Sequence, residues 1–354
     1  MPANPSLRAT VPATRSARPV GIWLLACAAL VFCILVVGGV TRLTHSGLSI
    51  VEWQPLIGAL PPLSAEAWEA TFQKYQLTPE FRLVNHQMTL DEFKGIFWWE
   101  YAHRLIGRGI GVAFALPFAW FWWRGYIQRA MAPKLIGIFL LGGLQGAMGW
   151  YMVKSGLVDD PRVSQFRLTA HLSLAFLIFS ALFWTGMGML QPRSRALPAA
   201  TAGLRRAALA LLFGVAYMVV TGGFVAGIRA GKAYNTFPLM NGHVVPPEIF
   251  MIEPWYANFF YNMATVQFDH RLGAWLLVVA VPLLWRAVRR NAQAQLAFGA
   301  MNFLIAALIA QIAMGIFTLL LAVPVALGAA HQGGAMVVFC AVLYLNHRLR
   351  VHAE

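Results

Sequence analysis

Residues 97–123 read FWWEYAHRLIGRGIGVAFALPFAWFWW, an apolar run whose first turns carry Glu100, His103, Arg104 and Arg108. The run is longer than the about 20 residues that a helix needs to cross ~30 Å of hydrocarbon. Ionisable side chains inside such a run are costly, so they indicate a functional site. The run therefore predicts a membrane-spanning helix with a site near one end.

The composition of the whole chain is that of a membrane protein. Of its 354 residues, 59% are hydrophobic and only 11% are charged, whereas a soluble globular domain has roughly 25% charged residues. Eight apolar runs are long enough to span a bilayer; they cover residues 21–41, 97–123, 134–153, 165–190, 204–228, 265–286, 297–321 and 325–346. We expect an all-α integral membrane protein with eight transmembrane helices.

The net charge of +14 reflects membrane topology rather than nucleic-acid binding, because the basic residues stand singly between apolar runs instead of clustering on a polar domain. If the N-terminus is cytoplasmic, fifteen basic residues fall in inner segments beside one acid, and the other twelve acids fall on the outer side. By the positive-inside rule, both termini are cytoplasmic. Residues 1–20 are expected to form a disordered cytoplasmic tail.

An internal repeat divides the chain into two units. Gly38-Gly39 in the first run corresponds to Gly222-Gly223 in the fifth, and His103-Arg104-Leu105 corresponds to His270-Arg271-Leu272. Four spans separate the equivalent positions, so the two halves have the same orientation in the membrane. We expect two pseudo-symmetric four-helix bundles, residues 21–195 with an outer loop over 42–96, and residues 196–354.

Four of the nine histidines recur at the outer ends of the even-numbered runs: His103, His171, His270 and His331. Within each unit the two are separated by one helix down and one helix up, so they return to the same depth. Paired neutral imidazoles on rigid helices could ligate a haem iron from both faces. Recurrence at equivalent positions weighs against histidines that only bond neighbouring helices, and the spacing lacks the local ligand pair of a zinc site. The remaining histidines are expected to be solvated or to pack in loops, and among them His86 is the one to test for a functional role.

The two units differ three residues before the first histidine, where one has Glu100 and the other has Gln267. The spacing puts each side chain on the same helix face as its histidine. The first unit thus keeps an ionisable acid for chemistry, while the second only holds a cofactor. Two structural alternatives remain: Glu100 could pair with Arg104, or it could simply favour the start of the helix. Haem propionates would be bound by guanidinium groups, and the candidates are Arg42, Arg104, Arg108, Arg229 and Arg271.

These residues resemble the haem A synthase family in its proteobacterial and mitochondrial form. The resemblance covers residues ~20–350 and rests on the stretches 39–44, 46–49, 85–90, 92–94, 98–108, 222–227 and 235–240. The cysteine pair that some other members carry in a loop is absent here.

The resemblance implies an enzyme that oxidises the C8 methyl group of haem O to a formyl group, giving haem A for aa3-type cytochrome oxidase. It implies a permanent haem b whose iron lies between His270 and His331, a haem O site between His103 and His171, and Glu100 as the catalytic acid. The partners it implies are haem O, haem O synthase (protohaem farnesyltransferase), an electron-transfer protein and the membrane lipid, and it is compatible with a homo-oligomer. The expected location is the cell inner membrane, with the haem sites near the periplasmic leaflet, rather than the mitochondrial inner membrane.

Two other functions compete with the enzyme. A transmembrane b-type cytochrome that only carries electrons should place haems near both leaflets, but all four histidines fall near one. A transporter built from repeated bundles should bind its substrate at the midplane, and the charged groups here are not at the midplane. A carrier would leave haem O unchanged in cells that make it, and a transporter would bind no haem.

Overall fold

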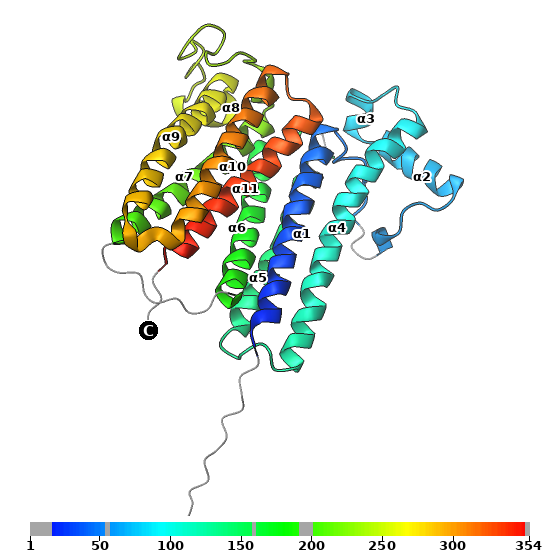
Figure 1. Ribbon diagram of the computed structural model, residues 1–354. Helices are drawn as coiled ribbons and strands as arrows, with labels where there is room; N and C mark the ends of the chain where they lie inside the picture. Colours follow the sequence, from blue (N-terminus) through cyan, green and yellow to red (C-terminus); the bar gives the residue numbers. More distant parts are fainter. Residues whose placement is uncertain (1–15, 54–56, 158–160, 191–200, 351–354) are drawn as a thin grey trace, which may run out of the picture.

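The computed structural model describes residues 16–53, 57–157, 161–190 and 201–350, which are helical with no strand among them (Figure 1). Eight of the described helices are long and apolar enough to cross a membrane. They are α1 (Arg18–Leu43), α4 (Leu90–Trp123), α5 (Ala132–Gly156), α6 (Gln165–Leu190), α7 (Ala202–Gly227), α9 (Met263–Arg290), α10 (Gln295–Leu320) and α11 (Val325–Arg348). The prediction of an all-α multi-pass membrane protein with eight spans is confirmed.

The shorter elements lie between the spans. The outer segment before α4 holds η1 (Ile57–Ala59), α2 (Ala65–Gln76) and α3 (Pro79–Leu83), and the segment after α7 holds η3 (Ala230–Lys232), η4 (Trp255–Ala257) and α8 (Asn258–Tyr261). A single turn, η5 (Ala292–Ala294), precedes α10. α1 begins at Arg18, so residues 18–20 of the predicted tail are helical, and residues 1–15 lie outside the described part.

α4 extends beyond the apolar run that predicted it. It begins at Leu90 because Thr89 and Glu92 cap it reciprocally: Glu92 N donates to Thr89 Oγ1 at 3.4 Å, and Thr89 N donates to Glu92 Oε2 at 2.8 Å. The added turns project past the apolar run. There Phe93 and Phe97 pack with Phe72 and Tyr75 of α2 in a buried aromatic cluster. The outer segment is therefore fixed to the same helix that carries Glu100 and His103.

The eight spans contact one another in two groups of four, which Figure 1 shows side by side. In the first group, α1 and α5 each contact both α4 and α6. In the second group, α7 and α10 each contact both α9 and α11. The groups meet where α1 packs on α11 and α6 packs on α7. A hydrogen bond crosses this contact, with Gln332 Nε2 donating to Leu35 O at 2.7 Å.

One continuous cluster of buried apolar side chains joins the two groups. Phe176 of α6 and Phe339 of α11 meet in it edge to face, with their ring centroids 5.1 Å apart. Leu24 of α1 and Leu345 of α11 are completely buried. Because membrane helices gain little from apolar burial alone, such close packing is the main attraction between them. The two groups are thus held as one body.

Candidate functional site

Each of the four predicted ligand histidines lies against a glycine of a neighbouring helix. An ideal Cβ placed on the glycine would lie within about 3 Å of the imidazole in every case, as follows: Gly38 to His103 Nε2 2.9 Å, Gly149 to His171 Cε1 3.1 Å, Gly222 to His270 Cε1 3.2 Å and Gly315 to His331 Cε1 2.8 Å. A side chain larger than hydrogen would displace the ring. The glycines therefore fix where the imidazoles can lie.

The histidines come together in the pairs that the sequence predicted. His103 of α4 and His171 of α6 interact electrostatically, and so do His270 of α9 and His331 of α11. No group of three or more His, Cys, Asp or Glu side chains that could hold a metal ion occurs within the described ranges. Two histidines are too few for a structural zinc site but are the number needed for axial ligation of haem iron.

The second histidine of each pair is supported in the same way. Gln145 Nε2 donates to the backbone oxygen of His171 at 3.1 Å, and Gln311 Nε2 donates to that of His331 at 2.9 Å. The Nδ1 atoms of both histidines are buried, and neither has a hydrogen-bond partner among the described residues. Buried ring nitrogens rarely stay unpaired in a finished protein. Four imidazoles, two of them with unpaired nitrogens, fit the donor set that a haem requires.

Glu100 is a buried carboxylate on which three donors converge. Its Oε2 accepts from Ser49 Oγ at 2.7 Å and from Ile50 N at 2.9 Å, and its Oε1 accepts from Arg104 Nη2 at 2.7 Å. The side chain is 3% exposed. The same Arg104 donates to the backbone oxygens of Ile50 and Glu52. The predicted alternative of a Glu100–Arg104 pair is therefore present, and it fastens the loop after α1 to α4; we call this set the Glu100 clamp.

An equivalent arrangement surrounds Gln267 on α9. Its Oε1 accepts from Arg271 Nη2 at 2.8 Å, and its Nε2 donates to Ala230 O at 2.7 Å. Arg271 also donates to Tyr234 O at 2.9 Å, and more weakly to Pro238 O at 3.4 Å. We call this set the Gln267 clamp. It fastens the loop after α7 to α9, much as the Glu100 clamp does for α1 and α4.

The structure distributes the five candidate arginines over three places rather than one. Arg104 and Arg271 each hold a loop in a clamp. Arg108 follows Arg104 by one turn on α4. Arg42, in the last turn of α1, is close enough to Arg229 for the two charges to interact. Arg42 and Arg229 therefore lie where the two helix groups meet.

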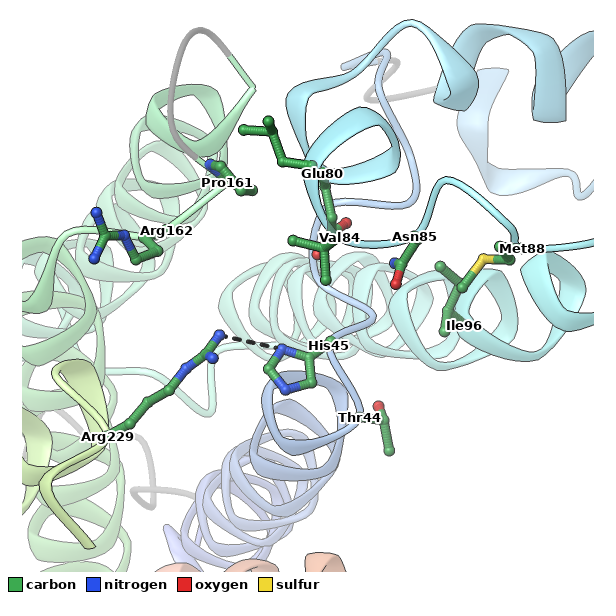
Figure 2. A pocket seen from close by; sticks show the side chains of 11 residues that line it. Thr44, His45, Glu80, Val84, Asn85, Met88, Ile96, Pro161, Arg162 and Arg229 are labelled. Carbon is green, nitrogen blue, oxygen red and sulfur yellow. Dashed lines mark hydrogen bonds between the residues drawn. The ribbon is translucent and has the colours of Figure 1, made fainter. Parts of the chain in front are cut away.

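A pocket of about 510 Å³ opens on the same side of the molecule (Figure 2). Its lining comes from the loop after α1, the outer segment, α4, the residues just before α6 and the loop after α7. It consists of Thr44, His45, Glu80, Leu83, Val84, Asn85, Met88, Ile96, Pro161, Arg162 and Arg229. Figure 2 shows Arg229 pointing at His45, with Nη2 3.4 Å from Nδ1. Both residues have left-handed backbone angles, with φ of 58° and 55°.

The pocket contains an acid that the sequence analysis missed. Burial raises the pKa of Glu80 to about 7, although Tyr75 donates a hydrogen bond to it at 3.3 Å. Burial and the nearby charges of Arg229, Lys232 and Arg42 lower the pKa of His45, which favours its neutral form. His86, singled out earlier in this segment, is exposed and does not line the pocket. Nothing in the spacing of residues 64–90 signals Glu80, because the pocket around it is lined by five different segments.

The sequence matches, over residues 21–343, the family COX15-CtaA, described as cytochrome oxidase assembly protein. Among curated relatives, it is 58% identical over 337 residues to a protein of Nitrosospira multiformis named "Heme A synthase", covering 94% of each chain. It is 50% identical over 327 residues to one of the same name from Parvibaculum lavamentivorans, covering 92% of this chain and 93% of the relative. It is 45% identical over 341 residues to "Heme A synthase COX15" of Arabidopsis thaliana, covering 94% and 74%.

Proposed function

This chain belongs to the cytochrome oxidase assembly family, and on that premise we propose that it is a haem A synthase, which oxidises the C8 methyl group of haem O to a formyl group. The single observation that carries the proposal is the set of four paired histidines, each fixed against a glycine, in a chain 58% identical to a protein with that name. Haem A of this kind serves aa3-type cytochrome oxidase.

We further propose that the first unit, residues 21–195, binds haem O between His103 and His171, and that the second, residues 196–354, holds haem b between His270 and His331. The two groups of four helices and the two matching clamps support this pseudo-symmetric division. The charge distribution supports cytoplasmic termini in a cell inner membrane, with the haem sites near the periplasmic leaflet. Haem O synthase would supply the substrate, an electron-transfer partner would accept electrons, and a homo-oligomer is compatible with both.

The chemistry assigned to the protein itself centres on Glu100. Oxidation of a methyl group builds positive charge at the carbon and releases protons, and a buried carboxylate can stabilise that charge. Because both oxygens of Glu100 accept hydrogen bonds, its role in this geometry is electrostatic. Haem b, which His270 and His331 would hold, would supply one-electron transfer.

Extraction of haems from cells that express the chain together with a haem O source tests the function. We expect haem A in the wild type, and a haem b spectrum that is lost in His270→Ala and in His331→Ala. The control is His86→Ala, an exposed histidine of the outer segment, which should keep both pigments. A wild type that leaves haem O unchanged while binding haem b would support the electron carrier instead.

A further inference from the structure

We infer that Thr221 is a positioning residue that locks the imidazole of His270 for permanent haem binding, and that Val37, at the equivalent place in the first unit, leaves His103 unlocked so that its haem can be exchanged. The inference rests on the proposed function for the identity of the bound group. It concerns residues that the family resemblance did not single out.

The lock consists of two hydrogen bonds. The Thr221 hydroxyl donates its only proton to Met218 O at 3.2 Å, and its Oγ1 lies 2.8 Å from His270 Nδ1. With the hydroxyl proton directed to Met218 O, the oxygen is free to accept a hydrogen bond from Nδ1–H, which is the arrangement that we infer. His270 then carries its proton on Nδ1, and Nε2 has a free lone pair. A histidine that binds a metal through Nε2 needs this tautomer. A hydrogen-bond acceptor at Nδ1 also orients the ring and makes Nε2 a stronger electron-pair donor to the metal.

The equivalent position in the first unit cannot make the lock. Gly222 faces His270 and Gly38 faces His103. The residues immediately before these glycines are Thr221 and Val37, which have almost the same shape, but valine has no polar atom. Within the described part of the chain, no hydrogen bond holds the His103 ring. The difference between the units at this place is therefore a single hydroxyl group.

The orientation of the rings agrees with this difference. His171, His270 and His331 turn Cε1 toward their glycines, whereas His103 turns Nε2 toward Gly38. In His270, Nε2 is the nitrogen that stays available. In His103, the same atom faces the backbone of α1. A rotation of the unlocked His103 ring would exchange its edges, and no hydrogen bond from the described residues opposes that rotation.

The two haems have opposite requirements, and the two positions match them. A resident haem must remain bound through many turnovers, so a fixed and strongly donating ligand is favourable. A substrate haem must leave after each oxidation, so a ligand that turns easily is favourable. Loss of such a supporting partner typically costs 10–100-fold in metal affinity, which is enough to separate a permanent site from an exchangeable one.

The test uses the full-length protein in detergent, with apomyoglobin in excess as the haem acceptor. In Thr221→Val, which copies the first unit, we expect haem b to be lost about 10–100 times faster. We also expect its midpoint potential to rise, because the imidazole donates less electron density to the iron. Thr221→Ser, which keeps the hydroxyl, should restore both values. In Val37→Thr loaded with haem O, release of that haem should slow by a similar factor.

A matched control separates the lock from general packing. Thr185 on α6 is as buried as Thr221, but its hydroxyl donates within its own helix, to Ala181 O at 2.6 Å, and makes no hydrogen bond to a histidine among the described residues. Thr185→Val should leave haem release and potential unchanged. The inference is overturned if Thr221→Val keeps the wild-type release rate and potential, or if Thr221→Ser behaves like Thr221→Val. A wild type without any haem b spectrum would instead defeat the proposed function.

Discussion

The Glu100 clamp and the Gln267 clamp occupy equivalent places, yet they pair with opposite kinds of backbone atom. Both side chains accept a hydrogen bond from the arginine four residues later. On its other side Glu100 meets the N–H of Ile50 and the hydroxyl of Ser49, whereas Gln267 meets the carbonyl of Ala230. A carboxylate can only accept, while an amide both accepts and donates. The Glu/Gln difference therefore has a structural cause in addition to the proposed chemical one.

The largest expected effect is that of Glu100→Gln on haem A formation. The amide cannot accept from Arg104 and from Ile50 N at once, and the negative charge is lost. We expect the haem A yield per protein to fall by about 100-fold or more, as for removal of a major electrostatic contact in an active site. Haem extraction measures the yield, and the haem b spectrum should remain.

A second variant separates charge from loop anchoring. Ser49→Ala removes one hydrogen bond of the Glu100 clamp but keeps the carboxylate and the Arg104 pair. If Glu100 acts on the reacting haem, the haem A yield of Ser49→Ala should fall by less than about tenfold. Equal losses in the two variants would show that Glu100 serves only to anchor the loop, and full yield in Glu100→Gln would eliminate both roles.

The next effect concerns the acids beside the two clamps. Glu80 and Glu248 each accept a hydrogen bond from a tyrosine, Tyr75 and Tyr234, but Glu80 is buried and Glu248 is exposed. The raised pKa means that between pH 4.5 and about 7 the folded protein keeps the Glu80 proton and the unfolded chain loses it. The stabilising contribution is thus present below pH 4.5 and lost as the pH rises through about 7.

Glu80→Gln removes this dependence. At pH 8 we expect the variant to be more stable than the wild type by up to about 3 kcal/mol, with the difference shrinking toward pH 5. Thermal unfolding in detergent at both pH values measures it, and Glu248→Gln is the exposed control. Charged groups near Glu80 that could alter the result are Glu100 and Arg229. A wild-type stability that rises from pH 5 to 8 relative to Glu80→Gln would contradict the assignment.

The smallest effect compares the glycines beside the second histidines. An alanine at Gly315 would put its Cβ 2.8 Å from His331, and one at Gly149 would put it 3.1 Å from His171. Overpacking of this kind typically costs 1–3 kcal/mol, so haem b retained by Gly315→Ala should fall by roughly tenfold. Gly149→Ala should weaken haem O binding less. Gly143→Ala, where no atom lies within 4 Å, should change neither pigment.

The repeat explains which features could be predicted from sequence. The four histidines were found because duplication places each at an equivalent position, so that coincidence is improbable. The Glu100–Arg104 pair was one of two structural alternatives, and only the geometry distinguishes them. Ser49 could not be predicted because its partner, Glu100, comes from a distant segment. Glu80 has a nearby partner in Tyr75, but the burial that raises its pKa depends on the fold. Thr221 could have been found by comparing the residues before Gly38 and Gly222, since Val37 and Thr221 differ at an otherwise matching place.

The contact between α1 and α11 has a consequence for the order in which the protein is made. α11 is synthesised after α1 and after the six spans between them, yet the two helices pack together and Gln332 reaches back to Leu35 O. The side of α1 that faces α11 must therefore wait in the membrane while the six spans between them are synthesised. Until residues 325–348 arrive, neither the contact between the two helix groups nor the His270–His331 pair can be complete. The haem proposed to lie between His270 and His331 could therefore acquire both ligands only after α11 has been made.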